Sequence, residues 1–492
     1  MKRGLTKYLG VLVPMVVVIA APLVLRDDEV VGARQADLRL EVITPHNEAI
    51  RREFGDAFSK WHEQKNGTSV YINWRTPGGT SEIKRVLDSA FLTAEKNGKQ
   101  GIGIDLFFGG GVYDFSLQAS EKRFEVLSIF DEQKELFESG VIPAMESGER
   151  FYPEERDWLG VCLSSFGICY NTDNLKRRGI KAPQSWMDLG DPSYQKGIAL
   201  ADPTKSGSVA KAFEMAVQQQ IHLKLKEGLS QEEACVQGWK KGLNLIQAIS
   251  ANARYFTDSA SKVPHDVAQG DAVAGLCIDF YGRSYSESLK KSDGKSRLEF
   301  VTPVGGSSIS VDPVAILRGA PHKQLAEEFV RFLYTPKGQM LWNAKPGSKL
   351  GPRSRALRRL PVRRDLYQEP YLSEMIDADV MPYETAEQFV YDANLTGKHF
   401  SPLRTIIRVM CIDSHQEMKL AWDALIQAEF PEEATQLFFD VGPVGYHEAI
   451  SRVRKVSKSK DSVEMMRMLN ELGQHFRENY LNAAKLAKGG VQ

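Results

Sequence analysis

The sequence carries no excess of either charge, because Lys and Arg together number 63 and Asp and Glu together also number 63. Proteins that bind nucleic acid are usually basic, so this balance argues against that class of partner, and we expect none. The sequence also lacks the short motifs of common catalytic sites: the G-x-S-x-G elbow, H-E-x-x-H, the phosphate loop G-x-x-x-x-G-K-[ST], and a glycine fingerprint with its downstream acid. We therefore predict a binding protein that is not an enzyme and that needs no cofactor.

Cysteine is scarce, with five residues in 492, and the odd number leaves at least one thiol free in a monomer. No two cysteines have the C-x-x-C spacing of a metal or redox site, so we expect no metal centre built on them. The prediction for all five is that they are small buried hydrophobic side chains. One disulfide remains open: Cys162 and Cys169 flank residues 163–168 and would pair if that segment folds back.

The N-terminus has the pattern of an export segment. Lys2, Arg3 and Lys7 precede an uncharged run over residues 8–25, and small residues at 31–33 offer a cleavage site. The run is about as long as the shortest membrane-spanning helix. Residues 1–36 are therefore predicted to be a signal peptide or an uncleaved anchor in the inner membrane. Either places the protein in a periplasm, with membrane contact only through this segment.

Alternating strands and helices begin immediately after the export segment. The apolar spacing predicts, in order, a strand at 38–44, a helix at 47–64, a strand at 68–74, a helix at 82–96 and a strand at 104–108. Such alternation is typical of a parallel sheet with right-handed crossovers. Ligands bind beyond the carboxyl ends of parallel strands, where the glycine-rich loops of this region fall.

A second region of the same kind follows. Helices are predicted at 209–226, 231–250 and 262–269, with strands at 198–200, 253–256 and 272–280. We assign residues 38–150 to a first lobe to which 300–345 return, residues 151–299 to a second lobe, and 346–492 to an extension. Two crossings between the lobes form a hinge, so closure around a ligand is the expected motion.

The most informative segment is 185–208, which reads SWMDLGDPSYQKGIALADPTKSGS. A short apolar strand ends at Asp202, and Thr204, Ser206 and Ser208 then lead into a helix. Free N–H groups, hydroxyls and the positive end of the helix dipole would meet there and favour a negatively charged or polar ligand. The alternative is an ordinary helix cap that serves stability alone.

The order of several sequence blocks resembles the periplasmic solute-binding proteins of ABC importers, in the branch for ferric iron, polyamines, thiamine, phosphonates and sugar phosphates. The blocks that carry the resemblance are 166–175, 186–188, 191–192, 197–208, 305–320, 326–333 and 335–342, within a span of about 38–345. The resemblance implies an α/β fold of the bilobal type II class, with two parallel-sheet lobes joined by a hinge. It also implies an ABC permease as partner and a monomeric protein that delivers a small molecule to it.

Loops at predicted strand ends supply the candidate ligand contacts. They are His46, Glu48, Thr80, Ser81, Gly109, Gly110, Ser165, Thr204, Ser206, Ser208, Ser259, Ser261, Asp279, Tyr281 and Arg283. Helix capping and tight turns are the alternative explanation for most of these positions.

The ligand class is ranked by the chemistry of these loops. Gly, Ser and Thr with an arginine suit a phosphate or phosphonate, so an organophosphate or phosphonate anion is the first expectation. Ferric members of the family use adjacent tyrosines, and here the first is Phe280, which cannot bind metal. A ferric site through His46 and Tyr281 therefore remains an alternative, as does an anchored ligand sensor.

Residues beyond 345 exceed the usual length of the family. Segment 352–365 contains six arginines, for which a solvated or ion-paired surface is expected and docking to a partner or an anionic membrane is the alternative. Helical patterns follow at 402–429 and 462–488, and connectors are expected at 382–394 and 430–446. We predict a mostly helical extension packed on the lobes.

Overall fold

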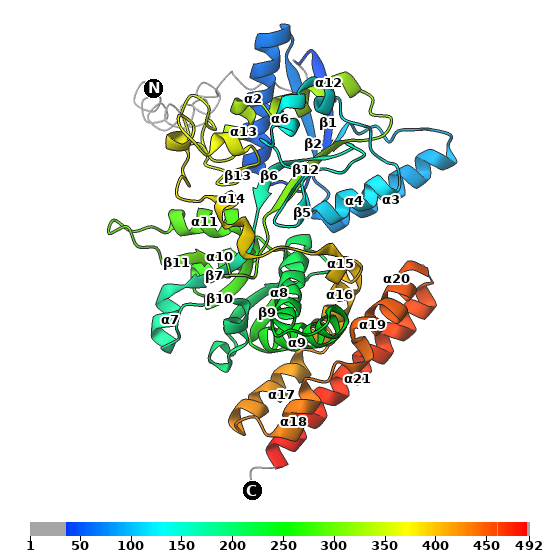
Figure 1. Ribbon diagram of the computed structural model, residues 1–492, viewed down its shortest axis with the longest axis vertical. Coiled ribbons are helices and arrows are strands. Elements are labelled where there is room, and N and C mark those ends of the chain that lie inside the picture. Colours follow the sequence, from blue (N-terminus) through cyan, green and yellow to red (C-terminus); the bar gives the residue numbers. More distant parts are fainter. Residues whose placement is uncertain (1–35, 460, 490–492) are drawn as a thin grey trace, which may run out of the picture.

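The computed structural model describes residues 36–459 and 461–489, so the predicted export segment lies outside the described residues apart from residue 36. Two α/β lobes are stacked along the long axis of the molecule, and a group of helices lies against the lower lobe (Figure 1). In the described part of the chain, no helix has the length and apolar character needed to span a membrane.

The first lobe is built on a sheet of strand order β13-β6-β12-β3-β1-β2. Only the pairs β1–β2 and β1–β3 are parallel, while β12 and β6 run antiparallel to their neighbours. The predicted all-parallel sheet is therefore corrected to a mixed one, because the chain re-enters this lobe from the opposite direction. The strands are β1 (Leu38–Ile43), β2 (Val70–Arg75), β3 (Leu106–Phe108), β6 (Leu159–Ser164), β12 (Ser310–Ile316) and β13 (Leu360–Pro361).

The second lobe is built on a sheet of strand order β11-β7-β10-β8-β9, which is also mixed. Strand β8 is parallel to β9 and β10, whereas β7 is antiparallel to β10 and β11. Its strands are β7 (Phe166–Asn171), β8 (Ile198–Ala201), β9 (Ala253–Thr257), β10 (Ala274–Ile278) and β11 (Leu298–Val301). A small separate hairpin is formed by β4 (Met145–Glu146) and β5 (Glu149–Arg150).

The helices lie close to their predicted positions, because the spacing of apolar residues and the capping residues indicate the same helix ends. Helix α2 is an example: the Asn47 side chain accepts from the Ile50 N–H at its start, and Gly67 ends it at φ 72°. The helices of the two lobes are α2 (Glu48–Asn66), α3 (Thr80–Lys96), α4 (Val112–Ser120), α5 (Ile129–Glu132), α6 (Lys134–Glu138), α7 (Thr172–Arg178), α8 (Gly207–Lys226), α9 (Gln231–Ala251), α10 (Lys262–Gln269), α11 (Asp279–Ser288), α12 (Lys323–Leu333) and α13 (Pro336–Met340).

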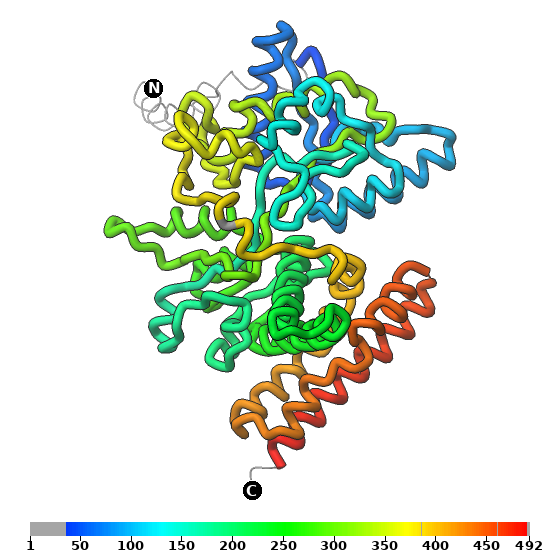
Figure 2. Tube along the Cα trace, in the orientation of Figure 1, coloured from blue at the N-terminus to red at the C-terminus, as the bar shows by residue number. Residues whose placement is uncertain are grey.

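The chain passes between the lobes three times rather than twice. It leaves the first sheet after Ser164, so the first crossing lies at Ser165 and not near residue 151. It returns between β11 and β12. A third passage follows, because Ala386 belongs to the hydrophobic core of the first lobe and Phe389 to that of the second. The tube in Figure 2 shows this segment running from the upper lobe to the lower one.

The extension is therefore divided between the lobes. Residues 346–386 have little regular structure and complete the core of the first lobe, to which Leu360 and Met375 belong. The helices beyond them share one continuous core with the second lobe. These helices are α15 (Ala393–Thr396), α16 (Phe400–Ile407), α17 (His415–Gln427), α18 (Glu432–Phe438), α19 (Tyr446–Glu448), α20 (Lys455–Ser459) and α21 (Ser462–Gly489), whereas α14 (Pro382–Thr385) lies in the part packed on the first lobe.

Two details of the extension differ from the sequence prediction. The segment expected to be helical at 402–429 contains a π-helical turn at Arg408–Ile412 between α16 and α17, and α18 forms inside the segment expected to be a connector. Buried hydrogen bonds attach the extension to the second lobe: Trp422 donates to Asn252 Oδ1 at 2.8 Å, and Trp239 donates to the Val444 carbonyl at 2.9 Å. All five cysteines are free and buried, as the buried-hydrophobe interpretation predicted.

Candidate ligand-binding site

A cavity of about 1040 Å³ lies between the two lobes. The first lobe contributes the loop Gly78–Thr80 before α3 and the turn Gly110–Asp114 at the start of α4. The second lobe contributes Lys205–Ser208 at the start of α8 and Asp258–Ser261 before α10. The extension adds Tyr391 and its neighbours, so three parts of the chain enclose the space.

Three helix N-termini meet at this cavity. Helices α3 and α4 begin after Gly79 and Gly111, and neither has a side chain that caps it. Helix α8 begins after Ser206, whose Oγ accepts from the Val209 N–H at a long 3.4 Å. The first N–H groups of a helix have no partner inside the helix and form its positive end. Their convergence favours a ligand with negatively charged oxygens.

The lobes approach each other closely where these helices begin. A Cβ atom on Gly207 would lie 3.1 Å from Thr80 Oγ1 and 3.7 Å from Asp114 Oδ2, across the cleft. Burial raises the pKa of the Asp114 carboxyl, while the nearby Arg404 and a hydrogen bond from Thr80 act against this rise. A carboxyl group that keeps its proton donates a hydrogen bond, which suits an oxyanion beside it.

His46 is a buried polar side chain without a hydrogen-bond partner among the described residues. Its side chain is 2 % exposed, both ring nitrogens lack a partner, and Nε2 lies 3.5 Å from Asp312 Oδ2, too far for a good hydrogen bond. Its ring packs edge-on against Phe108. Burial lowers the pKa of His46, so the imidazole is neutral near pH 7 and has one donor and one acceptor for a ligand. Gly109 lies directly behind it, and a Cβ there would come within 2.3 Å of His46 Cε1.

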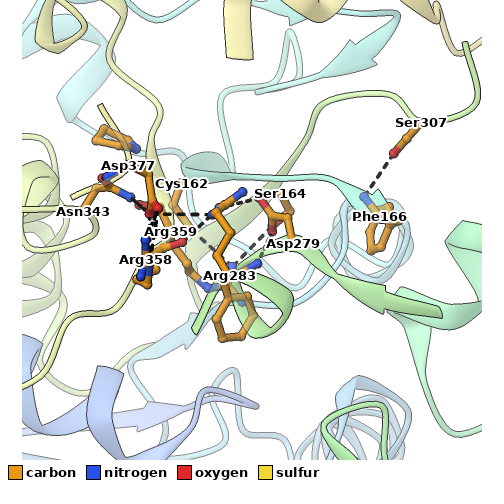
Figure 3. Close-up of polar contacts among 12 residues, drawn as sticks. Cys162, Ser164, Phe166, Asp279, Arg283, Ser307, Asn343, Arg358, Arg359 and Asp377 are labelled. Atoms are coloured by element: carbon orange, nitrogen blue, oxygen red, sulfur yellow. Dashed lines mark hydrogen bonds and ion pairs between the residues drawn. The ribbon is translucent and has the colours of Figure 1, made fainter. Parts of the chain in front are cut away.

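A buried ion pair closes the cavity next to His46. Arg359 Nη1 lies 2.5 Å from Asp312 Oδ2, and Ser164 Oγ donates to Asp312 Oδ1 at 2.9 Å. The Arg359 guanidinium also lies 4.1 Å from the ring centre of Phe280 and donates to Cys162 Sγ (Figure 3). Burial alone would raise the pKa of Asp312, but the adjacent Arg359 holds it below its usual value. Arg359 belongs to the six-arginine segment, so the expected exposed surface is wrong for this residue, which is 4 % exposed.

A second buried cluster spans the cleft around Lys211. The ammonium group lies 3.0 Å from Glu149 Oε1 of the first lobe and 3.0 Å from Glu214 Oε2 of its own helix. It also lies 3.3 Å from the ring centre of Tyr391, whose hydroxyl donates to Glu214 at 2.9 Å. Burial lowers the pKa of Lys211, but the two glutamates more than reverse this, so the lysine stays charged. The two glutamates that line this part of the cavity thus share one cation within the protein.

The predicted pair Asp279 and Arg283 does not line the cavity. Arg283 Nη2 donates to Asp279 Oδ2 at 2.8 Å and to the Arg358 carbonyl at 3.0 Å, and its Nε lies 3.7 Å from Asp377 Oδ2 (Figure 3). The two residues are one helical turn apart in α11, on the side that faces segment 358–377. The pair therefore attaches that segment to the second lobe, which corrects its expected place at the ligand.

The structure brings together part of the predicted set. The residues that line the cavity are His46, Thr80, Gly110, Ser206, Ser208, Ser259, Ser261 and Tyr281. Those that do not line it are Glu48, Ser81, Gly109, Ser165, Thr204, Asp279 and Arg283. Ser81 and Thr204 bind each other instead, because Ser81 Oγ donates to the Thr204 carbonyl at 3.2 Å across the cleft.

Several lining residues were missed in the sequence. Asp114 could have been predicted, because it follows the glycine run before α4, just as the predicted contacts lie in loops that precede helices. Lys211 and Glu149 lie in ordinary amphipathic or short-strand contexts, and Arg359 lies within a charge run. Their place at the cavity depends on contacts between distant segments, which no local pattern encodes.

Comparison with known proteins shows what the chain is similar to. Residues 129–348 match the family model described as bacterial extracellular solute-binding protein. A Haemophilus influenzae protein of uncharacterised function is 28 % identical over 265 residues, which are 53 % of this chain and 67 % of that protein. The phosphoglycerate transport regulatory protein PgtC of Salmonella typhimurium is 30 % identical over 183 residues, which are 37 % of this chain and only 40 % of PgtC.

Two solved structures show the same fold. The periplasmic binding protein AfuA from Actinobacillus pleuropneumoniae matches with a TM-score of 0.50 and 21 % identity, over 74 % of this chain and 98 % of AfuA. The substrate-binding protein of an ABC transporter from Agrobacterium tumefaciens matches with a TM-score of 0.52 and 14 % identity, over 76 % of this chain and 94 % of that protein. Residues 129–348 are therefore similar to the bacterial extracellular solute-binding proteins, and the chain has the fold seen in the periplasmic binding protein AfuA.

Proposed function

We propose that this protein is a periplasmic solute-binding protein that captures a small organophosphate or phosphonate and delivers it to an ABC permease without chemistry. The observation that carries the proposal is the meeting of the α3, α4 and α8 N-termini at one cavity, with α3 and α4 uncapped by side chains. Phosphate oxygens accept hydrogen bonds from such N–H groups and from serine and threonine hydroxyls. The name of PgtC, which concerns phosphoglycerate transport, agrees with this ligand class.

The charges of the cavity are compatible with an anion. The acidic groups on its walls other than Asp114 lie near cations of the protein: Glu149 and Glu214 share Lys211, Asp258 lies 2.6 Å from Lys205, Asp312 is paired with Arg359, and Glu82 lies 3.9 Å from the exposed Arg85. Asp114 lies at the helix N-termini, where its raised pKa favours the neutral form. The dipoles of the three helices add positive potential at the place where a ligand would sit.

A ferric site receives less support. Fe(III) is bound by phenolate and carboxylate oxygens, but burial raises the pKa of the Tyr281 hydroxyl and so opposes its ionisation. Among residues 36–459 and 461–489, no group of three or more His, Cys, Asp and Glu is arranged to hold a metal ion.

A ligand sensor is the second candidate, because the name of PgtC describes a regulatory protein. A sensor that signals from the membrane would keep its N-terminal segment, whereas an exported subunit would lose it. Mass spectrometry of the protein isolated from its host separates the two: loss of the predicted leader supports the transport subunit.

The test is a thermal-shift titration of the full chain with 3-phosphoglycerate, methylphosphonate, inorganic phosphate, spermidine and ferric citrate. A ligand that binds only the folded state raises the midpoint with the logarithm of its concentration, and 100 times Kd adds about 2.7 kcal/mol of stability. We expect this rise with a phosphorylated compound and its loss in the double variant Ser208→Ala/Ser259→Ala. Ser120→Ala, at the far end of α4, is the matched control, since Ser120 is exposed and bonds only within its own helix. A shift with ferric citrate alone would overturn the proposal.

A further inference from the structure

The C-terminal extension forms a wall of the ligand cleft. Tyr391, Ala393, Gly397 and Phe400 line the cavity, although all four lie beyond the segment that matches the solute-binding family. Helices α15 and α16 lie beside α8 (Figure 1), and Leu403 belongs to the core of the second lobe. This wall is therefore fixed to the second lobe and moves with it.

One side chain of the wall reaches both lobes. Arg404 in α16 donates from Nε to the Pro203 carbonyl at 2.7 Å and from Nη2 to the Thr204 carbonyl at 2.9 Å. Both carbonyls belong to the second lobe, between β8 and α8. The same Nη2 donates to Ser81 Oγ at 2.8 Å, in helix α3 of the first lobe. Because Ser81 also donates to Thr204, three groups from three parts of the chain meet at one point.

A second contact joins α16 to the first lobe. The ring of Phe400 lies 4.7 Å from the ring of Tyr113 in α4, at 49° between the planes. Both rings line the cavity. Opening of the cleft would break the bond from Arg404 to Ser81 and separate these two rings. The bonds from Arg404 to Pro203 and Thr204 would persist, because all three residues move together with the second lobe.

We propose that α16 is a latch: Arg404 and Phe400 grip the first lobe when the cleft closes and so slow the release of the bound ligand. Arg404 is a positioning residue in this scheme, since it acts on the closed state of the protein and not on the ligand. The effect on ligand release rests on the proposed binding function. The effect on the opening of the free protein does not.

The test compares Arg404→Lys with the matched variant Arg408→Lys. Lysine keeps the charge but has one nitrogen in place of the guanidinium fork. It therefore cannot donate hydrogen bonds to both carbonyl oxygens and to Ser81 Oγ in the geometry that arginine allows. Arg408 is one turn further along, exposed, and paired only with Asp413 at 3.5 Å, so its replacement leaves the latch intact. Dissociation of 3-phosphoglycerate is followed by stopped-flow tryptophan fluorescence. The radius of gyration of the free protein is measured by small-angle X-ray scattering.

We expect Arg404→Lys to release the ligand about tenfold faster, as loss of one charged hydrogen bond between the lobes implies. The free variant should also have a larger radius of gyration, while Arg408→Lys behaves as the wild type. Ser81→Ala removes the partner in the first lobe without a change in the extension, and it should reproduce both effects. In the Arg404→Lys background, Ser81→Ala should have a smaller effect than it has alone, because only its hydrogen bond to the Thr204 carbonyl is left to lose.

Failure of the two proposals can be told apart. If 3-phosphoglycerate and the other probes do not bind the wild type, the proposed function fails, and scattering from the free proteins still decides the latch. If the ligand binds and both Arg404→Lys and Ser81→Ala match the wild type in release rate and radius of gyration, the latch is refuted. An equal effect of Arg408→Lys would also refute it, because the cause would then be the replacement of any arginine in this region and not the loss of the bond to Ser81.

Discussion

Replacement of Arg359 with methionine is expected to destabilise the protein strongly, although the residue lies in a segment that reads as a charged surface. Its guanidinium lies 2.5 Å from Asp312 Oδ2 and 4.1 Å from the centre of the Phe280 ring. Arg359 is 4 % exposed and Asp312 is 7 % exposed. Methionine fills a similar volume, so the main loss is the charge that compensates the buried carboxylate.

The magnitude follows from the carboxylate that is left behind. Removal of one partner of a buried ion pair typically costs about 3–5 kcal/mol, because the other charge remains out of water. Asp312 would keep only the hydrogen bond from Ser164 Oγ at 2.9 Å and the neighbouring His46, which is neutral. We therefore expect Arg359→Met to lower the free energy of unfolding by about 3–5 kcal/mol at pH 7.

The loss of stability in Arg359→Met should depend on pH, because it follows the protonation of Asp312. In the wild type, burial raises the pKa of Asp312 but Arg359 holds it below the unfolded value, so the pair stabilises the protein above that value and the contribution is lost at lower pH. In Arg359→Met only burial remains, which raises the pKa of Asp312 above the unfolded value of about 3.9. The folded variant then gains a proton as the pH falls, and its deficit should shrink between pH 7 and pH 5.

Urea denaturation at pH 7 and pH 5 provides the assay. The double variant Arg359→Met/Asp312→Asn should recover most of the loss, since no buried charge remains. Arg355→Met is the matched control: Arg355 is exposed in the same segment, and its replacement should change stability by less than about 0.5 kcal/mol. The reasoning fails if Arg359→Met costs no more than this control, or if the deficit is the same at both pH values.

Three further predictions concern the walls of the cleft. Gly109→Ala should lower the free energy of unfolding by about 1–3 kcal/mol and weaken ligand binding. The reasons are that a φ of 85° disfavours alanine and that the new Cβ would displace the His46 ring. Denaturation midpoints and affinities equal to those of the wild type would contradict this. Asp114→Asn should bind 3-phosphoglycerate more tightly than the wild type does while the wild-type carboxyl is ionised, and isothermal calorimetry should show this difference in affinity narrowing as the pH falls and the carboxyl is protonated. Lys211→Met should lower the free energy of unfolding by about 3–5 kcal/mol in urea, since it leaves two buried glutamates without their cation, whereas Lys224→Met at a more exposed pair should change it by less than about 1 kcal/mol.

Local sequence signals were sufficient for most elements of the lobes. Strands such as β8 are short apolar runs ended by Asp202 and Pro203, and helices such as α9 begin at a capping box formed by Ser230 and Glu233. The mixed order of the sheets was not predicted, because the direction of β12 depends on where the chain re-enters the first lobe. That is a property of the whole fold and has no local pattern.

The candidate site was predictable only where it is made of loops at strand ends. Thr80, Ser206 and Ser259 were found because hydroxyl residues follow predicted strands, and all three line the cavity. The buried pair Asp312 and Arg359 was not found, since one residue lies in an apolar strand and the other in a charge run. Their partnership exists only because the segment after residue 345 folds back onto β6 as β13.

The third connection between the lobes changes what the extension can do. Residues up to Ala386 are packed into the first lobe, and those from Phe389 onward are packed into the second, so the connection runs beside the cleft. Ser147 Oγ of the first lobe donates to the Phe389 carbonyl at 2.5 Å, and the Tyr391 N–H donates to the Ser147 carbonyl at 2.9 Å. A lobe rotation must therefore bend or break this attachment as well as the two crossings of the hinge. The extension therefore takes part in the proposed closure in two ways. The connection between Ala386 and Phe389 joins the two lobes, and α16 contacts the first lobe across the cleft. The helices after α16 pack on the second lobe, to which α16 is attached.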